Sequence, residues 1–167
     1  MRPVARTRTI APVIALTFLF LAGSARPARA DITAFLGLSP TPQRHALKGF
    51  SAGLSLLIVG FEFEFSDLGE DDIERLPGLK TYSANAFAQT PIEIKGTQLY
   101  ATAGAGAYRE TLGAAEETHV GINLGGGAKI RLLGPLRLRL DYRVFRLRGS
   151  PLFSTYQRFY AGGNIAF

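Results

Sequence analysis

The stretch from residue 119 to residue 147 alternates between apolar and polar side chains almost without interruption. In its second half, every other position from Leu136 to Val144 is leucine, tyrosine or valine, and the positions between them are arginine or aspartate. Because successive side chains of a β-strand point to opposite faces, this pattern predicts a strand with one apolar and one ionic face. Leu133-Gly134-Pro135, which is typical of a turn, divides the stretch, so we expect an antiparallel hairpin.

Similar alternation recurs along the chain and predicts eight strands in all. The expected strands cover residues 31–39, 49–57, 61–65, 79–90, 97–110, 119–132, 136–147 and 157–167. No stretch carries a long 3.6-residue period, and glycine and proline recur too often for helices. Short and long connections alternate between these strands, and residues 66–78 and 111–118 are two of the expected long loops. The sequence therefore predicts an all-β, antiparallel up-and-down meander of eight strands.

Residues 1–30 have the organisation of a secretory signal peptide. An arginine-rich start precedes an apolar run, and small residues then precede an expected cleavage site at Ala30-Asp31. A membrane-spanning helix needs about 20 apolar residues, and this run is shorter. We therefore expect an exported protein whose barrel domain covers residues 31–167.

Removal of the leader changes what the charge of the chain implies. The leader holds five of the 19 basic residues and none of the 13 acidic ones, so the mature chain has 14 against 13, or a net charge of +1. The mature chain therefore lacks the high positive charge that would have been the main argument for a nucleic-acid partner. The chain has no cysteine, which excludes disulfides and thiolate metal sites. We expect no metal, no cofactor and a monomer.

An eight-stranded meander fits two barrels that are inside-out versions of each other. A soluble lipocalin-like barrel buries its apolar face, whereas an outer-membrane barrel turns that face to lipid. Eight strands enclose only enough room for side chains to fill, and Phe61, Phe63, Phe65 and the leucine rows would overfill it. The apolar row from Leu136 to Val144 spans about 21 Å vertically at a strand tilt of about 40°, close to the outer-membrane apolar band of about 25 Å.

Short turns at one end and longer loops at the other are also typical of outer-membrane barrels. These observations favour a transmembrane barrel whose polar lumen is filled with side chains. In such a barrel the third strand lies opposite the seventh, so its glutamates can meet arginines across the lumen. Unpaired charges would be very costly in a narrow dry core, whereas paired charges form a plug. The predicted lumen charges are Glu62, Glu64, Glu110, Asp141, Lys129, Arg131, Arg137, Arg139, Arg143 and Arg158, four acids and six bases.

The last strand carries a resemblance to a known family. Its outward positions include Phe159, Ile165 and a carboxy-terminal Phe167, and the pattern LGGGAKIRL…LRLRLDYRVF is typical of the family's penultimate hairpin. The chain resembles the small outer-membrane β-barrel proteins of Gram-negative bacteria, of the eight-stranded kind related to the OmpA transmembrane domain. This resemblance implies a location in the bacterial outer membrane and contact with its lipids. It also implies that the outer-membrane barrel assembly machinery recognises the last strand, including these three residues.

Arg109, Arg146 and Arg148 fall just beyond the predicted apolar band, where lipopolysaccharide phosphates would lie, and guanidinium groups suit phosphate. We expect a structural or interaction role for the barrel, with a narrow solute channel as the alternative. No catalytic residue is expected.

Some barrels of this size modify lipid A. His45 and Ser66-Asp67 occupy places comparable with residues of the palmitoyltransferase kind, but the amino-terminal helix of that kind has no room here. The deacylase kind has a serine two residues after a histidine, and His119 is followed there by Gly121. The acidic residues of loop 66–78 have no EF-hand spacing, which favours a solvated loop over a Ca²⁺ site.

Overall fold

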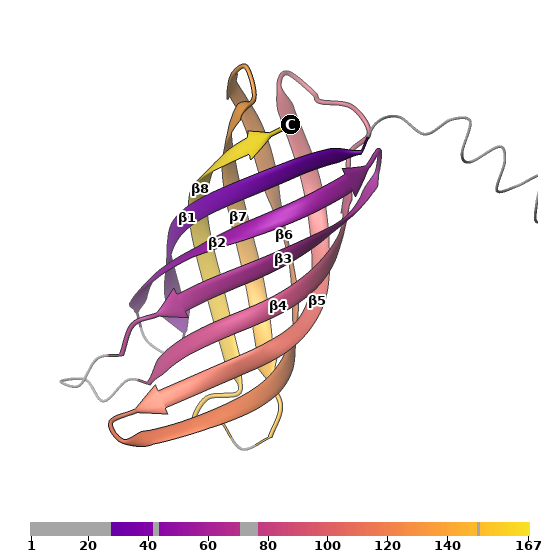
Figure 1. The fold of residues 1–167 in the computed structure, drawn as a ribbon. Helices are drawn as coiled ribbons and strands as arrows, with labels where there is room; N and C mark the ends of the chain where they lie inside the picture. Colours follow the sequence, from indigo (N-terminus) through magenta and orange to yellow (C-terminus); the bar gives the residue numbers. More distant parts are fainter. Residues whose placement is uncertain (1–27, 42–43, 71–76, 150) are drawn as a thin grey trace, which may run out of the picture.

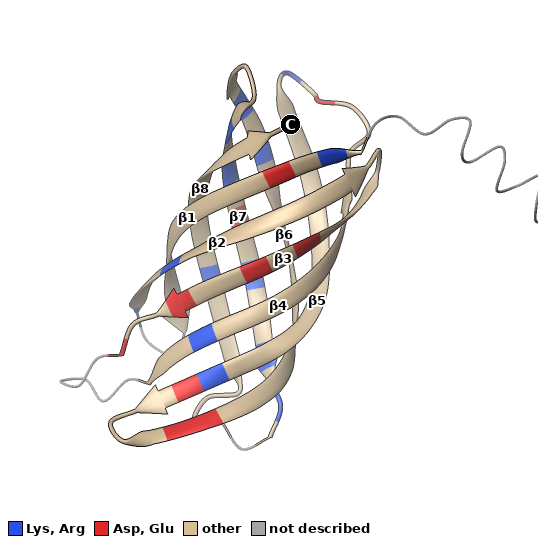
Figure 2. Ribbon diagram, in the orientation of Figure 1, with Lys and Arg blue, Asp and Glu red and all other residues tan. Residues whose placement is uncertain are grey.

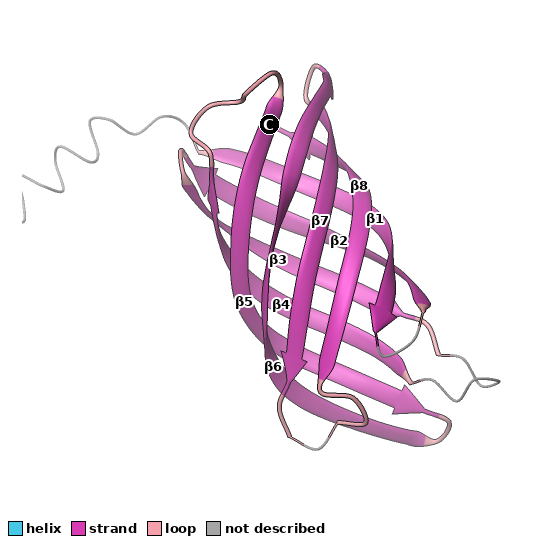
Figure 3. Cartoon of the chain, turned by 180° about the vertical axis from the view of Figure 1, so that it is seen from behind, coloured by secondary structure: helices cyan, strands magenta, loops and turns pink. Residues whose placement is uncertain are grey.

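The computed structural model describes residues 28–41, 44–70, 77–149 and 151–167, which form one closed antiparallel barrel (Figures 1 and 3). The strands are β1 (Arg29–Thr41), β2 (His45–Leu56), β3 (Val59–Leu68), β4 (Gly78–Gln89), β5 (Thr97–Leu112), β6 (Ala115–Leu133), β7 (Leu136–Leu147) and β8 (Thr155–Ala166). Each strand pairs with the next, and β1 closes the barrel on β8. The predicted eight-stranded meander is confirmed. No helix in the described part of the chain is long and apolar enough to cross a membrane.

The two faces of the barrel wall have opposite chemistry. Apolar side chains cover the outer face, where Leu36, Phe61 and Leu124 are each about 70% exposed. Polar and charged side chains fill much of the inner face, where Glu64 and Arg143 have no exposed surface. A water-soluble barrel has the reverse distribution, and this one is typical of barrels that span a membrane.

The two ends of the barrel are distinguished by the chain termini. At the terminal end, Ala30 and Phe167 exchange two backbone hydrogen bonds of 2.9 Å, which close the β1–β8 seam (Figure 1). The β2–β3, β4–β5 and β6–β7 connections lie at this end, and the other connections lie at the opposite, loop end. Strand β1 begins at Arg29, so the predicted cleavage site lies within its first residues; residues 1–27 of the predicted leader lie outside the described residues.

The predicted loop at residues 111–118 is wrong. Strands β5 and β6 continue through it to a two-residue turn at Gly113-Ala114, where Gly113 has a φ of 59° that suits glycine. This polar hairpin extends past its neighbours at the loop end (Figure 1) and buries few side chains, so it lacks a clear apolar alternation. The predicted strict alternation of short and long connections is also wrong. The β4–β5 connection at the terminal end spans residues 90–96, whereas the β5–β6 turn at the loop end has two residues.

Candidate functional site

A charge network crosses the lumen at the middle of the barrel. Glu62 on β3 meets Arg139 and Arg143 on β7, and these strands lie on opposite walls of the barrel (Figure 2). The Glu62 Oε1 atom accepts hydrogen bonds from Arg139 Nη2 at 3.1 Å and from Arg143 Nη2 at 2.8 Å, and Arg139 Nη1 also contacts Oε2. All three side chains are at most 2% exposed. Ion pairs across the lumen thus connect β3 and β7, in addition to the hydrogen-bonded strands of the barrel wall that lie between them.

Two further carboxylates complete the central cluster. Arg143 Nη1 lies 3.0 Å from Glu64 Oε2, and Arg143 Nε lies 3.2 Å from Asp141 Oδ1. Arg139 Nη2 lies 2.9 Å from Asp141 Oδ2. Residues 139, 141 and 143 share the inner face because side chains two apart on a strand point the same way. Two guanidinium groups therefore hold three carboxylates, and each arginine bridges two or more of them.

Hydroxyl groups supply the remaining hydrogen bonds. Tyr160 Oη donates to Glu64 Oε2 at 2.8 Å, and Ser51 Oγ donates to Glu62 Oε2 at 3.0 Å. Tyr100 Oη donates to Asp141 and accepts from Arg139 Nε, whose guanidinium also lies 4.9 Å from the Tyr100 ring centre. These donors compensate the excess of carboxylates, since a buried charge is stable only when it is paired and hydrogen-bonded. Both tyrosines lie at inner positions of their strands, β5 and β8.

A second layer of ion pairs lies near the terminal end. Lys129 pairs with Asp31, and its ammonium lies 5.0 Å from the Phe87 ring centre. The sequence placed Lys129 among the lumen charges, and Asp31 of β1 is its partner in the structure. Arg137 lies 3.3 Å from Glu93 in the β4–β5 connection and donates to Gln98 Oε1 at 3.4 Å.

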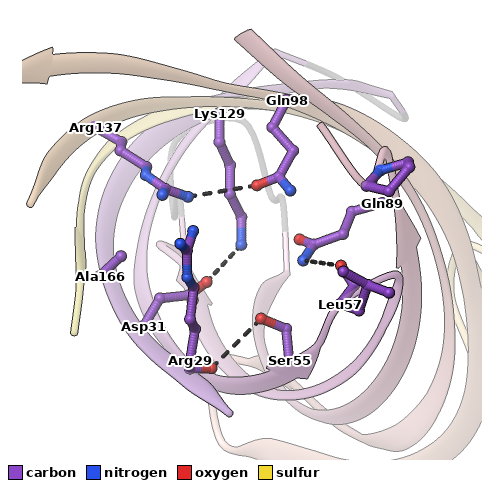
Figure 4. A pocket seen from close by; sticks show the side chains of 10 residues that line it. Arg29, Asp31, Ser55, Leu57, Gln89, Gln98, Lys129, Arg137 and Ala166 are labelled. Atoms are coloured by element: carbon purple, nitrogen blue, oxygen red, sulfur yellow. Dashed lines mark hydrogen bonds and ion pairs between the residues drawn. The ribbon is translucent and has the colours of Figure 1, made fainter. Parts of the chain in front are cut away.

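A polar cavity of about 140 Å³ opens beside this layer (Figure 4). Figure 4 shows Lys129 pointing to Asp31 and Arg137 pointing to Gln98 around it. The hydrogen-bonded side chains of Gln89 and Ser55 also line it, so its wall is mostly polar, with Leu57, Pro91 and Ala166 as its apolar part. The cavity is a shallow vestibule at the terminal end, and the central cluster lies beyond it.

Arg131 does not belong to the lumen. Its side chain is 54% exposed and lies 2.6 Å from Glu93 at the terminal rim. By the alternation of β6, Arg131 lies on the inner side of the strand. It is so close to the strand end, however, that its side chain reaches the solvent. Without Arg131 and with Asp31, the buried charged residues of the described chain number five acids and five bases. The predicted surplus of lumen positive charge is therefore absent from this part of the chain.

The loop-end half of the lumen is more apolar than expected. A cluster of buried aromatic and leucine side chains fills it, formed by Phe35, Leu47, Leu68, Leu79, Tyr108, Phe145, Leu147, Tyr156 and Tyr160. Arg158 lies within this half, where its guanidinium carbon is 4.1 Å from the Phe145 ring centre. It donates to Ser66 Oγ at 2.6 Å and to Thr81 Oγ1 at 3.2 Å. The lumen thus contains charged groups at its middle and aromatic and leucine side chains on their loop-end side.

Glu110 also points inward, but it lies apart from the central cluster, near the loop end. It accepts hydrogen bonds from the backbone nitrogen of Leu152 at 3.1 Å and from Tyr156 Oη at 3.3 Å. The Nε2 atom of His119 lies 3.6 Å from its carboxylate. Glu110 therefore connects the wall to the β7–β8 connection.

The residues predicted at the rim and on the last strand lie on the outer face. Arg109, Arg146 and Arg148 are exposed at the loop end, and Arg109 lies 3.3 Å from Glu116. Phe159, Ile165 and Phe167 are at least 50% exposed on or directly after β8. Neither set contributes to the lumen.

Ser66 and Asp67, two of the residues considered for lipid A chemistry, lie on opposite faces of β3. Ser66 points into the lumen and bonds to Thr81 and Arg158, whereas its neighbour Asp67 lies on the outer side of β3. Within the described ranges, no cluster of three or more histidine, aspartate or glutamate residues is suited to a metal ion.

Comparison with known proteins gives structural matches alone. No family model and no curated protein matches the sequence. Among solved structures, the barrel is similar to Neisserial surface protein A, with 15% identity, a TM-score of 0.68, and coverage of 86% of this chain and 99% of that one. It is similar to the N-terminal β-barrel domain of Pseudomonas aeruginosa OprF, with 14% identity, a TM-score of 0.66, and coverage of 83% and 97%.

The outer membrane enzyme PagL is also similar, with 10% identity, a TM-score of 0.50, and coverage of 81% of this chain and 98% of that one. This fold therefore does not exclude an enzyme, and function has to be argued from the site. The chain has the fold of the eight-stranded outer-membrane β-barrels.

Proposed function

We propose that the protein is a bacterial outer-membrane barrel with a closed lumen, serving envelope integrity and surface contacts rather than transport or catalysis. The observation that carries the proposal is the central cluster. Glu62, Arg139 and Arg143 join opposite walls, and their side chains are almost fully buried. The cluster of buried aromatic and leucine side chains fills the loop-end half of the lumen. A solute would have to displace both layers.

The outer face supports the membrane location. Phe50, Phe65 and Tyr82 form an outward row of neighbouring rings on β2, β3 and β4, with centres 5.0 to 5.6 Å apart. Aromatic girdles at the membrane interface are typical of such barrels. One outward position closer to the loop end, Lys48 and Lys80 on β2 and β4 mark the change from apolar to charged side chains. This end would face the exterior and the terminal end the periplasm.

The alternative function, a narrow channel, is tested by the conductance of the refolded protein in planar bilayers. We expect no steady conductance steps, because the central cluster joins opposite walls and the rings occupy the loop-end half of the lumen. The outer-face variant Ala103→Leu, which keeps the lumen intact, should be equally silent and controls for refolding. Steady steps of one defined size in both proteins would refute the closed lumen and favour the channel.

Lipopolysaccharide is the proposed partner of the loop-end rim. Lys80 and Arg109 are paired neighbours on the outer faces of β4 and β5, next to Asp67, and both are exposed. With the predicted Arg146 and Arg148 they form a basic rim suited to phosphate groups. The acidic Asp67 lies next to Lys80 in this rim. The basic residues would therefore contact phosphate groups one by one rather than as a continuous positive surface.

Replacing both Lys80 and Arg109 by glutamine is expected to weaken lipopolysaccharide binding by about 2- to 30-fold, since exposed pairs contribute about 0.2–1 kcal/mol each. The measurement is the lipopolysaccharide retained by purified barrels at matched detergent concentration. Lys95→Gln removes an exposed charge at the terminal end and should leave retention unchanged. Equal retention by the double variant and the wild type would remove this partner from the account.

A further inference from the structure

His119 lies where β5, β6 and the β7–β8 connection meet at the loop end. Its side chain is 7% exposed, and its Nε2 atom lies 3.4 Å from Glu117 Oε2 and 3.6 Å from Glu110 Oε2. Neither distance belongs to a hydrogen bond in this structure, so Nε2 is a buried polar atom without a hydrogen-bond partner. An imidazole nitrogen between two carboxylates is favourable only as a donor.

The β7–β8 connection lies directly against His119 and Glu110. A Cβ atom added at Gly149, whose φ is 101°, would stand 2.9 Å from His119 Nδ1, so the loop backbone lies against the imidazole. Glu110 meanwhile accepts from the Leu152 backbone nitrogen in the same loop and from Tyr156 Oη on β8. The histidine and the carboxylate beside it therefore both contact this connection, at Gly149 and at Leu152.

Charged and titratable groups surround His119. The titratable and charged residues that face it from the neighbouring elements are Tyr108 and Glu110 on β5, Glu117 on β6, Arg148 after β7 and Tyr156 on β8. Arg148 is exposed, whereas the two carboxylates lie beside Nε2. Imidazole is the side chain that ordinarily changes charge between about pH 5 and pH 8.

We propose that His119 is a proton-operated latch that holds the β7–β8 connection against the β5–β6 hairpin. Protonation places a donor on Nε2 between Glu110 and Glu117 and forms two ion pairs. This fixes Glu110, and through it the Leu152 amide and Tyr156. In the neutral state the ion pairs are lost, and the connection is held by its remaining hydrogen bonds and packing. The loop-end mouth is thereby closed more firmly in acid.

The test is hydrogen exchange at the Leu152 amide in the full-length refolded barrel, corrected for intrinsic exchange, at about pH 5 and about pH 8. Two such ion pairs predict about 2- to 30-fold greater protection in acid. His119→Gln should give the same protection at both pH values. His45→Gln, which changes the other histidine of the chain, should keep the wild-type response.

Two results would overturn the proposal. One is a wild-type protein with equal protection at the two pH values, and the other is His119→Gln with the full wild-type response. Should His119→Gln fail to fold, Glu117→Gln serves instead, because this side chain is 66% exposed and lies on the rim. It is expected to reduce the pH response, and an unchanged response would contradict a latch with two carboxylates.

Discussion

Replacing Glu62 by glutamine is expected to lower the free energy of unfolding by about 3–5 kcal/mol, the usual cost of removing one partner from a buried ion pair. Glu62 is the carboxylate that both Arg139 and Arg143 contact across the lumen. Glutamine has similar volume, so the loss reports the charge and not a cavity. Two guanidinium groups would remain buried with Asp141 and Glu64 as their carboxylate partners.

The measurement is urea unfolding of barrels refolded into vesicles, followed by the β-sheet circular dichroism signal, since the chain has no tryptophan. Glu116→Gln is the matched control, because Glu116 pairs at the loop-end rim with Arg109 and both side chains are about half exposed. That variant is expected to lose about 1 kcal/mol or less. If Glu62→Gln cost no more than Glu116→Gln, the central cluster would not stabilise the barrel. A double-mutant cycle with Arg139→Gln then measures the coupling energy directly.

The main features of this cluster were predictable from the sequence. Alternation alone placed Glu62, Arg139 and Arg143 on the same face of the wall, because the side-chain period of a strand is two. Counting strands around an eight-stranded barrel then placed the third opposite the seventh. Both steps use only local pattern and closure, and both agree with the ion pairs that the structure shows.

The heights of the inner residues were less predictable. Lys129 pairs with Asp31 of β1, a residue that was not among the predicted lumen charges. The level at which two distant strands bring their side chains together depends on the tilt and shear of the whole barrel, which no single segment encodes. Asp31 is also the first residue of the predicted mature chain. No alternating residues of the same predicted strand precede it, so the pattern indicates little about which face it occupies.

The polar hairpin at the loop end was missed for a different reason. Alternation identifies a strand when one of its faces is buried, and the hairpin from residue 111 to residue 118 extends beyond the barrel. Its residues are therefore mostly polar on both faces, which is also the composition of a loop. His119 follows directly and lies at the first buried position of β6.

Placing arginine at Ala103 is expected to destabilise the barrel by about 2–4 kcal/mol, the cost of a charged side chain near the bilayer midplane of a membrane barrel. Ala103 lies on the outer face of β5, about midway between the terminal end and the rim residue Arg109. Its outward neighbours are Ala86 and Leu124, so no acidic partner stands beside it. The substitution removes no packing contact of a large side chain and leaves the lumen untouched.

The central claim is that the apolar outer face lies in lipid, and unfolding of Ala103→Arg beside Ala103→Leu in lipid vesicles tests it most directly. We predict a loss of about 2–4 kcal/mol for the arginine variant, and a change within about 0.5 kcal/mol for the leucine variant. Arginine tolerated within about 0.5 kcal/mol, as at an exposed site in water, would contradict the membrane placement of this barrel.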